Sequence, residues 1–171
     1  FVGLSMGGYI GWQFWKKYSA RLAGLIQCDT RAIADTAEAA ANRRQLAERV
    51  LREGSGCVAE AMLPKLFSPG VASTTLEQTR QVMLHNPPAG IAAALRGMAV
   101  RPDVTDWLPQ IELPTLLVVG ESDVISPPAE MEGLAEIIPD AAWLVVPQAG
   151  HMAPLENPKV FNEAGEECLM L

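Results

Sequence analysis

The chain of 171 residues carries 20 acidic and 13 basic side chains, which gives a formal net charge of −7 at pH 7. This length indicates one domain, or one domain and part of another. An acidic chain without a basic stripe is not expected to bind nucleic acid, and no apolar run approaches the roughly 20 residues of a membrane span. Its three cysteines follow no disulfide or zinc spacing, which favours a reducing, cytoplasmic setting. No metal or organic cofactor is expected.

The first part of the chain reads as a strand, a helix, a second strand and then a run of helices. Residues 1–5 have the pattern of a strand end, and residues 7–19 have the apolar spacing of an amphipathic helix. The nearly continuous apolar run at 22–28 is typical of a buried parallel strand. Pro64 is expected to break the second of the helices that follow. These helices are expected at 34–54, 55–67, 73–86 and 88–99.

Strand patterns return in the last part of the chain. Apolar runs at 113–123 and 141–151 each end in a loop, and an amphipathic helix is expected between them at 127–140. A final helix is expected to have Pro158 near its first turn, where proline is favoured. Its tail at 164–171 is less regular.

The order of these elements predicts an α/β fold. Strands that alternate with helices indicate a parallel sheet with crossover helices, here of about four strands. The core of this fold is expected at 1–30 and 105–171. The helices between these segments show no strand signal, so we expect residues 31–104 to form a helical cap inserted after the second strand.

The pentapeptide GLSMG at residues 3–7 lies between the first expected strand and the first expected helix. A serine on such a strand-to-helix turn is held in a strained backbone conformation with its hydroxyl clear of the sheet. Glycines at positions 3 and 7 are expected to remove side chains that would clash there. The pattern predicts that Ser5 is a nucleophile and that the backbone N–H of Met6 stabilises an oxyanion. A plain glycine-rich turn is the alternative.

A serine nucleophile needs a base, and the chain contains two histidines. His151 follows the last expected strand, in the loop PQAGHMAPLENP. That loop lies at the carboxyl edge of the sheet, where parallel-sheet proteins place their sites. His85 lies near the end of a cap helix and is more typical of a helix-end residue. His151 is therefore the predicted base.

The acid that orients this base is expected in another loop that follows a strand. Asp123, in VVGESDVISPP, fits that position, whereas Glu121 in the same loop is more typical of a solvated turn residue. Asp29, in LIQCDT, follows an earlier strand and is a competing candidate. The chain order Ser5, Asp123, His151 is one used by serine hydrolases, and it favours Asp123 as the acid.

These segments together resemble the C-terminal two-thirds of an α/β-hydrolase-fold enzyme. GLSMGG is similar to the nucleophile elbow, PTLLVVGESDVISPP to the strand and loop of the acid, and VVPQAGHMAPLENPKVFN to the histidine loop and final helix. Within that superfamily the chain is most similar to the carboxylesterase and 3-oxoadipate enol-lactonase-like group. The resemblance covers essentially the whole chain. It implies hydrolysis of a small carboxylic ester or lactone by Ser5, Asp123 and His151.

The resemblance also implies that the chain is an N-terminally truncated part of such an enzyme, beginning in the fifth strand of the fold. Members of the superfamily have a preceding loop that supplies a second oxyanion N–H, and no segment of residues 1–171 resembles that loop. The chain alone is therefore expected to have little esterase activity. Its first strand is expected to present an unpaired edge that favours association, which leaves the oligomeric state open.

Two further expectations concern substrate binding and reaction type. The cap is expected to wall an apolar acyl pocket, although such side chains more often form the core of a cap. Its candidate lining residues are Met62, Leu66, Met83 and Met98. The alternatives to ester hydrolysis are C–C bond hydrolysis, cofactor-free peroxidation by the same residues, and a catalytically inactive binding protein. A complete serine, acid and histidine set argues against the last, because binding alone does not need it.

Overall fold

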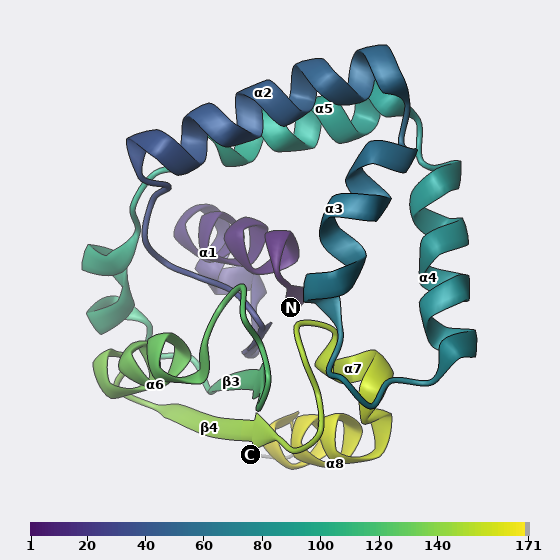
Figure 1. The fold of residues 1–171 in the computed structure, drawn as a ribbon. Helices are drawn as coiled ribbons and strands as arrows, with labels where there is room; N and C mark the ends of the chain where they lie inside the picture. The colour runs from purple at the N-terminus through teal and green to yellow at the C-terminus, as the bar shows by residue number, and fades with distance from the viewer. Residues whose placement is uncertain (170–171) are drawn as a thin grey trace. The chain divides into compact units, whose positions relative to one another are not determined.

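The computed structural model describes residues 1–169 of the chain (Figure 1). These residues separate into two compact units, one with the sheet and one with most of the helices between its second and third strands. The first unit consists of Phe1–Ala32, Lys65–Gly70 and the chain from Val104 onward, and the second of Ile33–Pro64 and Val71–Asp103. The segment Lys65–Gly70 groups with the sheet rather than with the helices on either side of it.

Four parallel strands form the sheet, in the spatial order β1-β2-β3-β4. Their bounds are β1 Val2–Leu4, β2 Leu25–Cys28, β3 Thr115–Gly120 and β4 Ala141–Val146. In register, Leu4 pairs with Cys28, and Cys28 pairs with Val118. All four strands therefore end at the same edge of the sheet, and the loops that follow them meet there. This arrangement confirms the predicted parallel α/β sheet.

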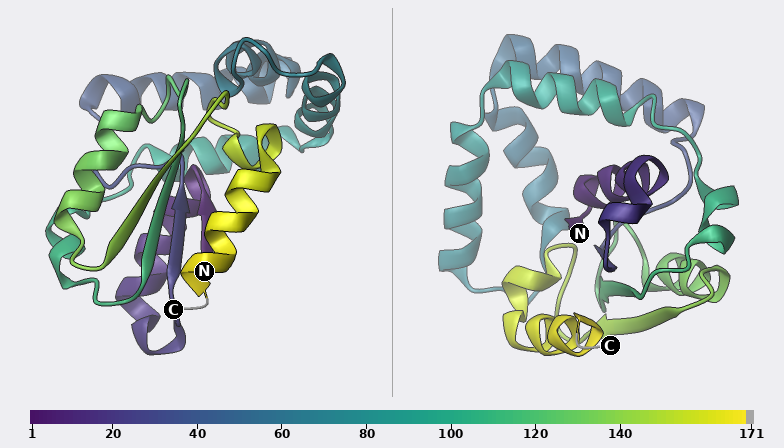
Figure 2. Two further views of the ribbon diagram at one scale, coloured as in Figure 1. Left: turned by 90° about the horizontal axis from the view of Figure 1, so that it is seen from below. Right: turned by 180° about the vertical axis from the view of Figure 1, so that it is seen from behind.

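Helices pack on both faces of this sheet (Figure 2). On one face, side chains of α1 (Met6–Tyr18) and α6 (Pro128–Ile137) share a buried core with β2 and β3. On the other face, α8 (Pro158–Leu169) packs against alternate residues of the same strands. Leu117 belongs to the first core and Val118 to the second, as the side-chain alternation of a strand requires. Right-handed crossovers predict this arrangement, with the helix after the histidine loop on the second face.

The described elements of the second unit are helices. They are α2 (Ala37–Glu53), α3 (Gly56–Leu66, whose end reaches into the first unit), α4 (Ser73–His85) and α5 (Pro88–Met98). α2 begins after Thr36, whose hydroxyl accepts a hydrogen bond from Ala39 N at 3.1 Å and caps the helix. Ala47 and Leu95 lie in the core that α2 and α5 share. The fully buried alanine allows the two helices to approach each other closely.

Two helices are more regular than the sequence suggested. α3 continues through Pro64 to Leu66, where a break was expected. Proline there lies in the last turn, so it interrupts only the end of the hydrogen-bond ladder. The tail at 164–169 belongs to α8, so the prediction that it would be less regular is wrong. It stays helical because Ala164 and Cys168 continue the apolar face of the helix. Residues 170–171 lie outside the described residues.

Short elements complete the described fold. Two 3₁₀ turns, η1 (Ser19–Arg21) and η2 (Thr105–Gln110), were not predicted, and a one-turn helix α7 (Ala153–Glu156) precedes α8. Segments of three to six residues are too short to give a periodic apolar pattern, which is why the sequence did not indicate them. Among the described helices, none combines the length and the apolar character needed to cross a membrane.

Candidate active site

Ser5 lies in the tight turn between β1 and α1. Its backbone has φ 52° and ψ −111°, a left-handed φ that residues other than glycine rarely adopt. Ser5 N donates a hydrogen bond to Cys28 O at 2.8 Å, and Ser5 O accepts one from Thr30 Oγ1 at 2.7 Å. The end of β2 therefore holds the strained turn in place. Within the described residues the hydroxyl makes no capping hydrogen bond to α1, which leaves it available to His151.

His151 connects Ser5 to Asp123. Its Nε2 lies 2.8 Å from Ser5 Oγ, and its Nδ1 lies 2.8 Å from Asp123 Oδ2. His151 and Asp123 are almost completely buried, with 3% and 4% of their surfaces exposed. The expected contact between Asp123 and Nδ1 is therefore present, and this hydrogen bond goes to Asp123 rather than to Asp29.

Backbone N–H groups of its own loop orient Asp123. Oδ1 accepts hydrogen bonds from Ile125 N at 2.7 Å and from Ser126 N at 3.0 Å. Because these donors hold one oxygen, the other is left facing His151. Sequence reasoning missed these two residues. An aspartate at the start of a loop is the signal that could have indicated them, because its side chain often accepts hydrogen bonds from the N–H groups two or three residues ahead.

The glycines around Ser5 differ in how much space a side chain would have. A Cβ on Gly3 would lie 2.5 Å from Gly7 O, and a Cβ on Gly8 would clash with the side chain of Thr30. Apart from its chain neighbours and the backbone of its own helix, a Cβ on Gly7 would meet no described atom within 4 Å. The expectation that Gly7 avoids a clash is therefore wrong. The close approaches occur at Gly3 and Gly8 instead, where α1 passes the ends of β1 and β2.

Gly3→Ala is expected to lower the free energy of unfolding by about 1–3 kcal/mol, because the added methyl group meets backbone that cannot move without opening the turn. Gly7→Ala is the matched control, and alanine there should be neutral or should stabilise α1 by up to about 1 kcal/mol. Urea unfolding of both variants measures the difference. Equal stability of the two would contradict this description of the turn.

Met6 is the first residue of α1. The first N–H groups of a helix have no acceptor within the helix, and they carry the partial positive charge of its dipole. The Met6 N–H therefore follows Ser5 directly, at a position suited to stabilising negative charge on a substrate oxygen. Its role as an oxyanion donor stays a prediction.

Glu156, the last residue of α7, holds the loop that carries His151. Its Oε1 accepts a hydrogen bond from Gly150 N at 2.6 Å. Its Oε2 accepts hydrogen bonds from Ser68 N at 2.9 Å and from Ser68 Oγ at 2.6 Å. Glu156 thus ties the residue before His151 to the segment Lys65–Gly70 of the same unit. Sequence reasoning missed Glu156, although a carboxylate inside the histidine loop was a visible signal.

Glu156→Gln is expected to lower the free energy of unfolding by about 1–3 kcal/mol, because one carboxylate oxygen becomes an NH₂ group that faces hydrogen-bond donors. Glu163→Gln is the control. Glu163 is exposed and its ion pair with Lys159 is long, at 3.9 Å, so its loss should cost less than about 0.5 kcal/mol. Urea unfolding compares the two variants. A loss no larger than that of the control would show that the three hydrogen bonds contribute little.

Asp29, the competing acid, lies beside these residues. Its side chain is fully buried, with Oδ1 accepting a hydrogen bond from Gly120 N at 2.8 Å and Oδ2 accepting one from Cys28 Sγ at 3.0 Å. One carboxylate oxygen of Asp29, one of Asp123 and one ring nitrogen of His151 lie within 4.8 Å of one another. Burial, together with the charge of Asp123, raises the pKa of Asp29 to about 7.

These same three side chains are the group, among the described residues, whose donor atoms are close enough to hold a metal ion. Asp123 and His151 are already hydrogen-bonded to each other at 2.8 Å, and both oxygens of Asp29 accept hydrogen bonds. A metal ion would have to replace these bonds. The arrangement therefore fits a hydrogen-bond network better than a metal site.

The raised pKa of Asp29 predicts a pH-dependent stability. The folded chain keeps this proton up to about pH 7, whereas an ordinary aspartate loses it near 3.8. The stabilising contribution is therefore complete below about pH 4 and is lost as the pH rises through about 7. Asp29→Asn, which cannot ionise, should remove this loss, while the exposed control Asp140→Asn should keep it. Urea unfolding at about pH 5 and about pH 8 tests this, and an unchanged pH dependence in Asp29→Asn would contradict it.

Two other charged candidates have local partners. His85 ends α4, and its Nδ1 lies 2.6 Å from Gln81 O of the same helix, as a helix-end histidine would. Glu121 is exposed, and its Oε2 accepts a hydrogen bond from Gln148 N at 3.0 Å. Glu121 is therefore more than a solvated turn residue, because it links the loop of Asp123 to the loop of His151.

The candidate pocket residues of the cap are largely accounted for by packing. Met62, Met83 and Met98 are partly buried against the core of the second unit. Leu66 is buried, with 9% of its surface exposed. Their use as the wall of an acyl pocket stays a prediction.

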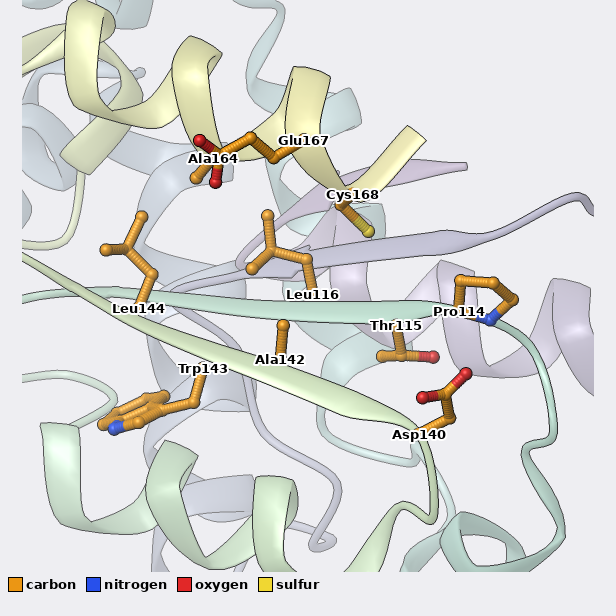
Figure 3. Close-up of a pocket in the computed structure, with 10 residues that line it drawn as sticks. All are labelled: Pro114, Thr115, Leu116, Asp140, Ala142, Trp143, Leu144, Ala164, Glu167 and Cys168. Atoms are coloured by element: carbon orange, nitrogen blue, oxygen red, sulfur yellow. The ribbon is translucent and has the colours of Figure 1, made fainter. Parts of the chain in front are cut away.

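A pocket of about 630 Å³ lies elsewhere on the first unit (Figure 3). It is formed between α8 and strands β3 and β4, where Leu116, Leu144 and Ala164 line it and Asp140 and Glu167 add carboxylates. Thr115 and Asp140 place it toward the amino-terminal edge of the strands. Parallel-sheet proteins bind their substrates at the opposite edge, where Ser5 lies, so this pocket is not part of the candidate site.

The chain is similar to known hydrolases in sequence and in structure. It matches the sequence model of the Alpha/beta hydrolase family over residues 1–164. It is 28% identical to 3-oxoadipate enol-lactonase 2 of Acinetobacter baylyi, over 99% of this chain and 62% of that protein. A thermophilic esterase from Thermogutta terrifontis is 50% identical with a TM-score of 0.97, over 99% of this chain and 63% of that one. The enol-lactonase from Burkholderia xenovorans LB400 is 26% identical with a TM-score of 0.89, over 100% of this chain and 65% of that one.

The chain thus spans a little under two thirds of the length of these relatives. The family match includes the turn at Ser5 and the loops of Asp123 and His151. The parallel sheet, the turn after its first strand and the meeting of the two later loops agree with that match. By sequence and by fold, the chain belongs to the alpha/beta hydrolase family, in which it is similar to esterases and enol-lactonases.

Proposed function

We propose that the protein is a serine hydrolase that cleaves a small carboxylic ester or lactone through an acyl-enzyme formed on Ser5. One observation carries this proposal: two successive 2.8 Å contacts join Ser5 Oγ to His151 Nε2 and His151 Nδ1 to Asp123. The similarity to an esterase and to two enol-lactonases favours esters and lactones as the substrate class.

In the acylation step, Ser5 Oγ attacks the carbonyl carbon of the substrate while His151 Nε2 takes the hydroxyl proton. The carbonyl oxygen becomes negative in the tetrahedral intermediate, and the Met6 N–H is placed to donate to it. His151 then gives its proton to the leaving alkoxide oxygen as the C–O bond breaks. An ester thus loses an alcohol, whereas a lactone opens and stays attached to Ser5.

In the deacylation step, a water molecule replaces the alcohol. His151 removes a proton from the water, whose oxygen attacks the acyl carbon, and the bond to Ser5 Oγ breaks as that oxygen regains a proton. Asp123 keeps His151 in the tautomer with hydrogen on Nδ1 and stabilises the imidazolium that forms in both steps. The two backbone donors to Asp123 Oδ1 hold the carboxylate in that orientation.

Labelling with a fluorophosphonate tests the proposal. The full-length natural protein that contains this chain is treated with the probe, and the tryptic peptide that ends at Lys16 is examined by mass spectrometry. Label is expected on Ser5, and heat-unfolded protein is the control, because labelling requires the folded arrangement of serine and histidine. An unlabelled Ser5 in folded protein would overturn the proposal.

A panel of p-nitrophenyl esters of increasing acyl length, together with lactones, then defines the substrate. Hydrolysis of one of these classes, lost when the protein is labelled, is the expected result. A labelled Ser5 without turnover of any ester or lactone would instead favour C–C bond hydrolysis or peroxidation. No label and no turnover would favour a binding protein of the same fold.

A further inference from the structure

Hydrogen bonds to its backbone hold the loop that carries His151. Gln148 N donates to Glu121 Oε2 at 3.0 Å, and Ala149 O accepts from Ser122 N at 2.8 Å. Both partners lie in the loop after β3. Gln148 has a left-handed φ of 56°, which residues other than glycine rarely adopt. The loop therefore depends on contacts from other segments to keep this shape.

Glu156 closes a short ring of chain around His151. The helix α7 begins two residues after His151 and ends at Glu156, whose Oε1 accepts a hydrogen bond from Gly150 N at 2.6 Å. This bond joins the residue before His151 to the end of the helix after it. A glutamate side chain loses rotational freedom when it makes such a bond, so the bond is more stable where the carboxylate is already held in place. The place of His151 thus depends on what holds the second carboxylate oxygen.

Ser68 holds that second oxygen from a distant part of the chain. Its N and Oγ both donate to Glu156 Oε2, at 2.9 and 2.6 Å, and its Oγ also lies 3.1 Å from Gln148 O. Hydrogen bonds to a carboxylate are stronger than those between neutral groups. Only 7% of the surface of Ser68 is exposed, so little water competes for them. Ser68 therefore fixes the carboxylate that fixes the histidine loop.

The backbone around Ser68 also packs directly against Gly150. A Cβ on Gly150 would lie 2.7 Å from Phe67 C and 2.8 Å from Ser68 N. On the other side, a Cβ on Gly120 would overlap Gly150 O. Gly150 is thus enclosed between the end of β3 and the segment Lys65–Gly70. Because both contacts are already close, a displacement of that segment toward the loop also displaces Gly150.

We infer that Ser68 is a positioning residue of the site, which keeps His151 within reach of Ser5. It acts through Glu156 and Gly150. Ser68 lies in the chain that joins α3 to α4, so a segment between two helices of the inserted region sets the place of the base. The inference rests on the proposed function, because the place of His151 affects a rate only if His151 is the base of the reaction. Misplacement of such a group by about 1 Å can cost about 10²-fold in rate.

Ser68→Ala tests the inference, because it removes one of the three hydrogen bonds to Glu156. In the full-length protein, the rate constant of fluorophosphonate labelling and kcat for a p-nitrophenyl ester should both fall about 10- to 100-fold. KM should stay within about twofold, because substrate binding before the reaction does not need the base. Ser73→Ala is the control, since it makes the same change at an exposed position in the first turn of α4, and it should alter none of these values.

Labelling to completion separates a positioning role from a purely structural one. It counts the intact sites, and kcat is then expressed per labelled site. If Ser68 only stabilises the fold, Ser68→Ala lowers the number of sites that can be labelled and leaves the rate per site unchanged. That result would overturn the inference.

A double variant shows whether Ser68 acts through Glu156. Glu156→Gln removes the carboxylate to which Ser68 donates, so adding Ser68→Ala to Glu156→Gln should slow labelling by less than about threefold. A further loss as large as that of Ser68→Ala in the wild type would mean that the two residues act separately. The inference would then be wrong.

Amide hydrogen exchange at Gly150, measured by nuclear magnetic resonance, tests the same link without any reaction. Ser68→Ala should raise the exchange rate of the Gly150 N–H about 3- to 10-fold, the effect of one weakened hydrogen bond. The N–H of Ile125, which donates to Asp123 in the other loop, should exchange as in the wild type. An unchanged rate at Gly150 would overturn the inference even if ester hydrolysis is confirmed.

The proposed function can fail separately. If Ser5 of the wild type is never labelled, that function is wrong, whereas faster exchange at Gly150 would still support the link from Ser68 to the histidine loop. If Ser68→Ala does not fold, Ser68→Cys replaces it. Its thiol is a weak donor, so the same changes are expected at a smaller size. Labelling and exchange at wild-type rates in Ser68→Cys would then overturn the inference.

Discussion

Ser5→Ala is expected to lower ester hydrolysis by the full-length protein about 10⁵- to 10⁶-fold. Alanine keeps the Cβ that residue 5 already has, so the strained turn can still form. It removes the oxygen that lies 2.8 Å from His151 Nε2, and with it both the nucleophile and the atom that would hold the acyl group. Binding and electrostatic stabilisation alone leave a residual acceleration of about 10³–10⁴ over water. Steady-state kinetics on a p-nitrophenyl ester measure the loss.

Ser19→Ala is the matched control for this substitution. Ser19 is exposed in η1 at the other end of α1, so the same change of side chain there should leave both turnover and fluorophosphonate labelling unchanged. Labelling should disappear in Ser5→Ala alone. Retention of more than about a tenth of the wild-type rate in Ser5→Ala would mean that another residue is the nucleophile.

The sheet could be predicted from the sequence because each strand is a compact apolar run bounded by a clear turn signal. The run LLVVG in β3 and the run LIQC in β2 are buried on both faces, and such runs are typical of parallel strands. The parallel direction of the strands then followed from their alternation with helices, whereas their spatial order is given by the structure. The regular end of α8 was not predicted, because its apolar positions are small residues, Ala164 and Cys168, which give a weak periodic signal.

The candidate site was predictable to the extent that its residues follow strands. Parallel strands end at one edge, so residues after β1, β3 and β4 meet there although 146 positions separate Ser5 from His151. The features that sequence reasoning missed depend on backbone geometry within the loops. Glu156 and the donors to Asp123 are of this kind. The place of Asp29 next to His151 depends on the side-chain direction set by its left-handed φ, which no sequence pattern specifies.

His151→Gln should cost nearly as much activity as Ser5→Ala, about 10⁵-fold or more in kcat. Glutamine has a similar reach, and its amide can still donate to Asp123, so the buried carboxylate keeps a partner and the fold is preserved. It cannot accept the proton of Ser5 at neutral pH. His85→Gln is the control, because the Nδ1 of His85 faces Gln81 O of its own helix. That variant should keep the wild-type rate.

The combination of the two substitutions distinguishes one catalytic unit from two independent contributions. If Ser5 and His151 act together, removing the first makes the second useless, and Ser5→Ala/His151→Gln should be no slower than either single variant. Independent contributions would instead multiply, and the double variant would fall below each single one by the full factor of the other. Measuring kcat for the wild type, both single variants and the double variant completes this double-mutant cycle. A multiplied loss would exclude a proton transfer between Ser5 and His151, whatever their 2.8 Å separation suggests.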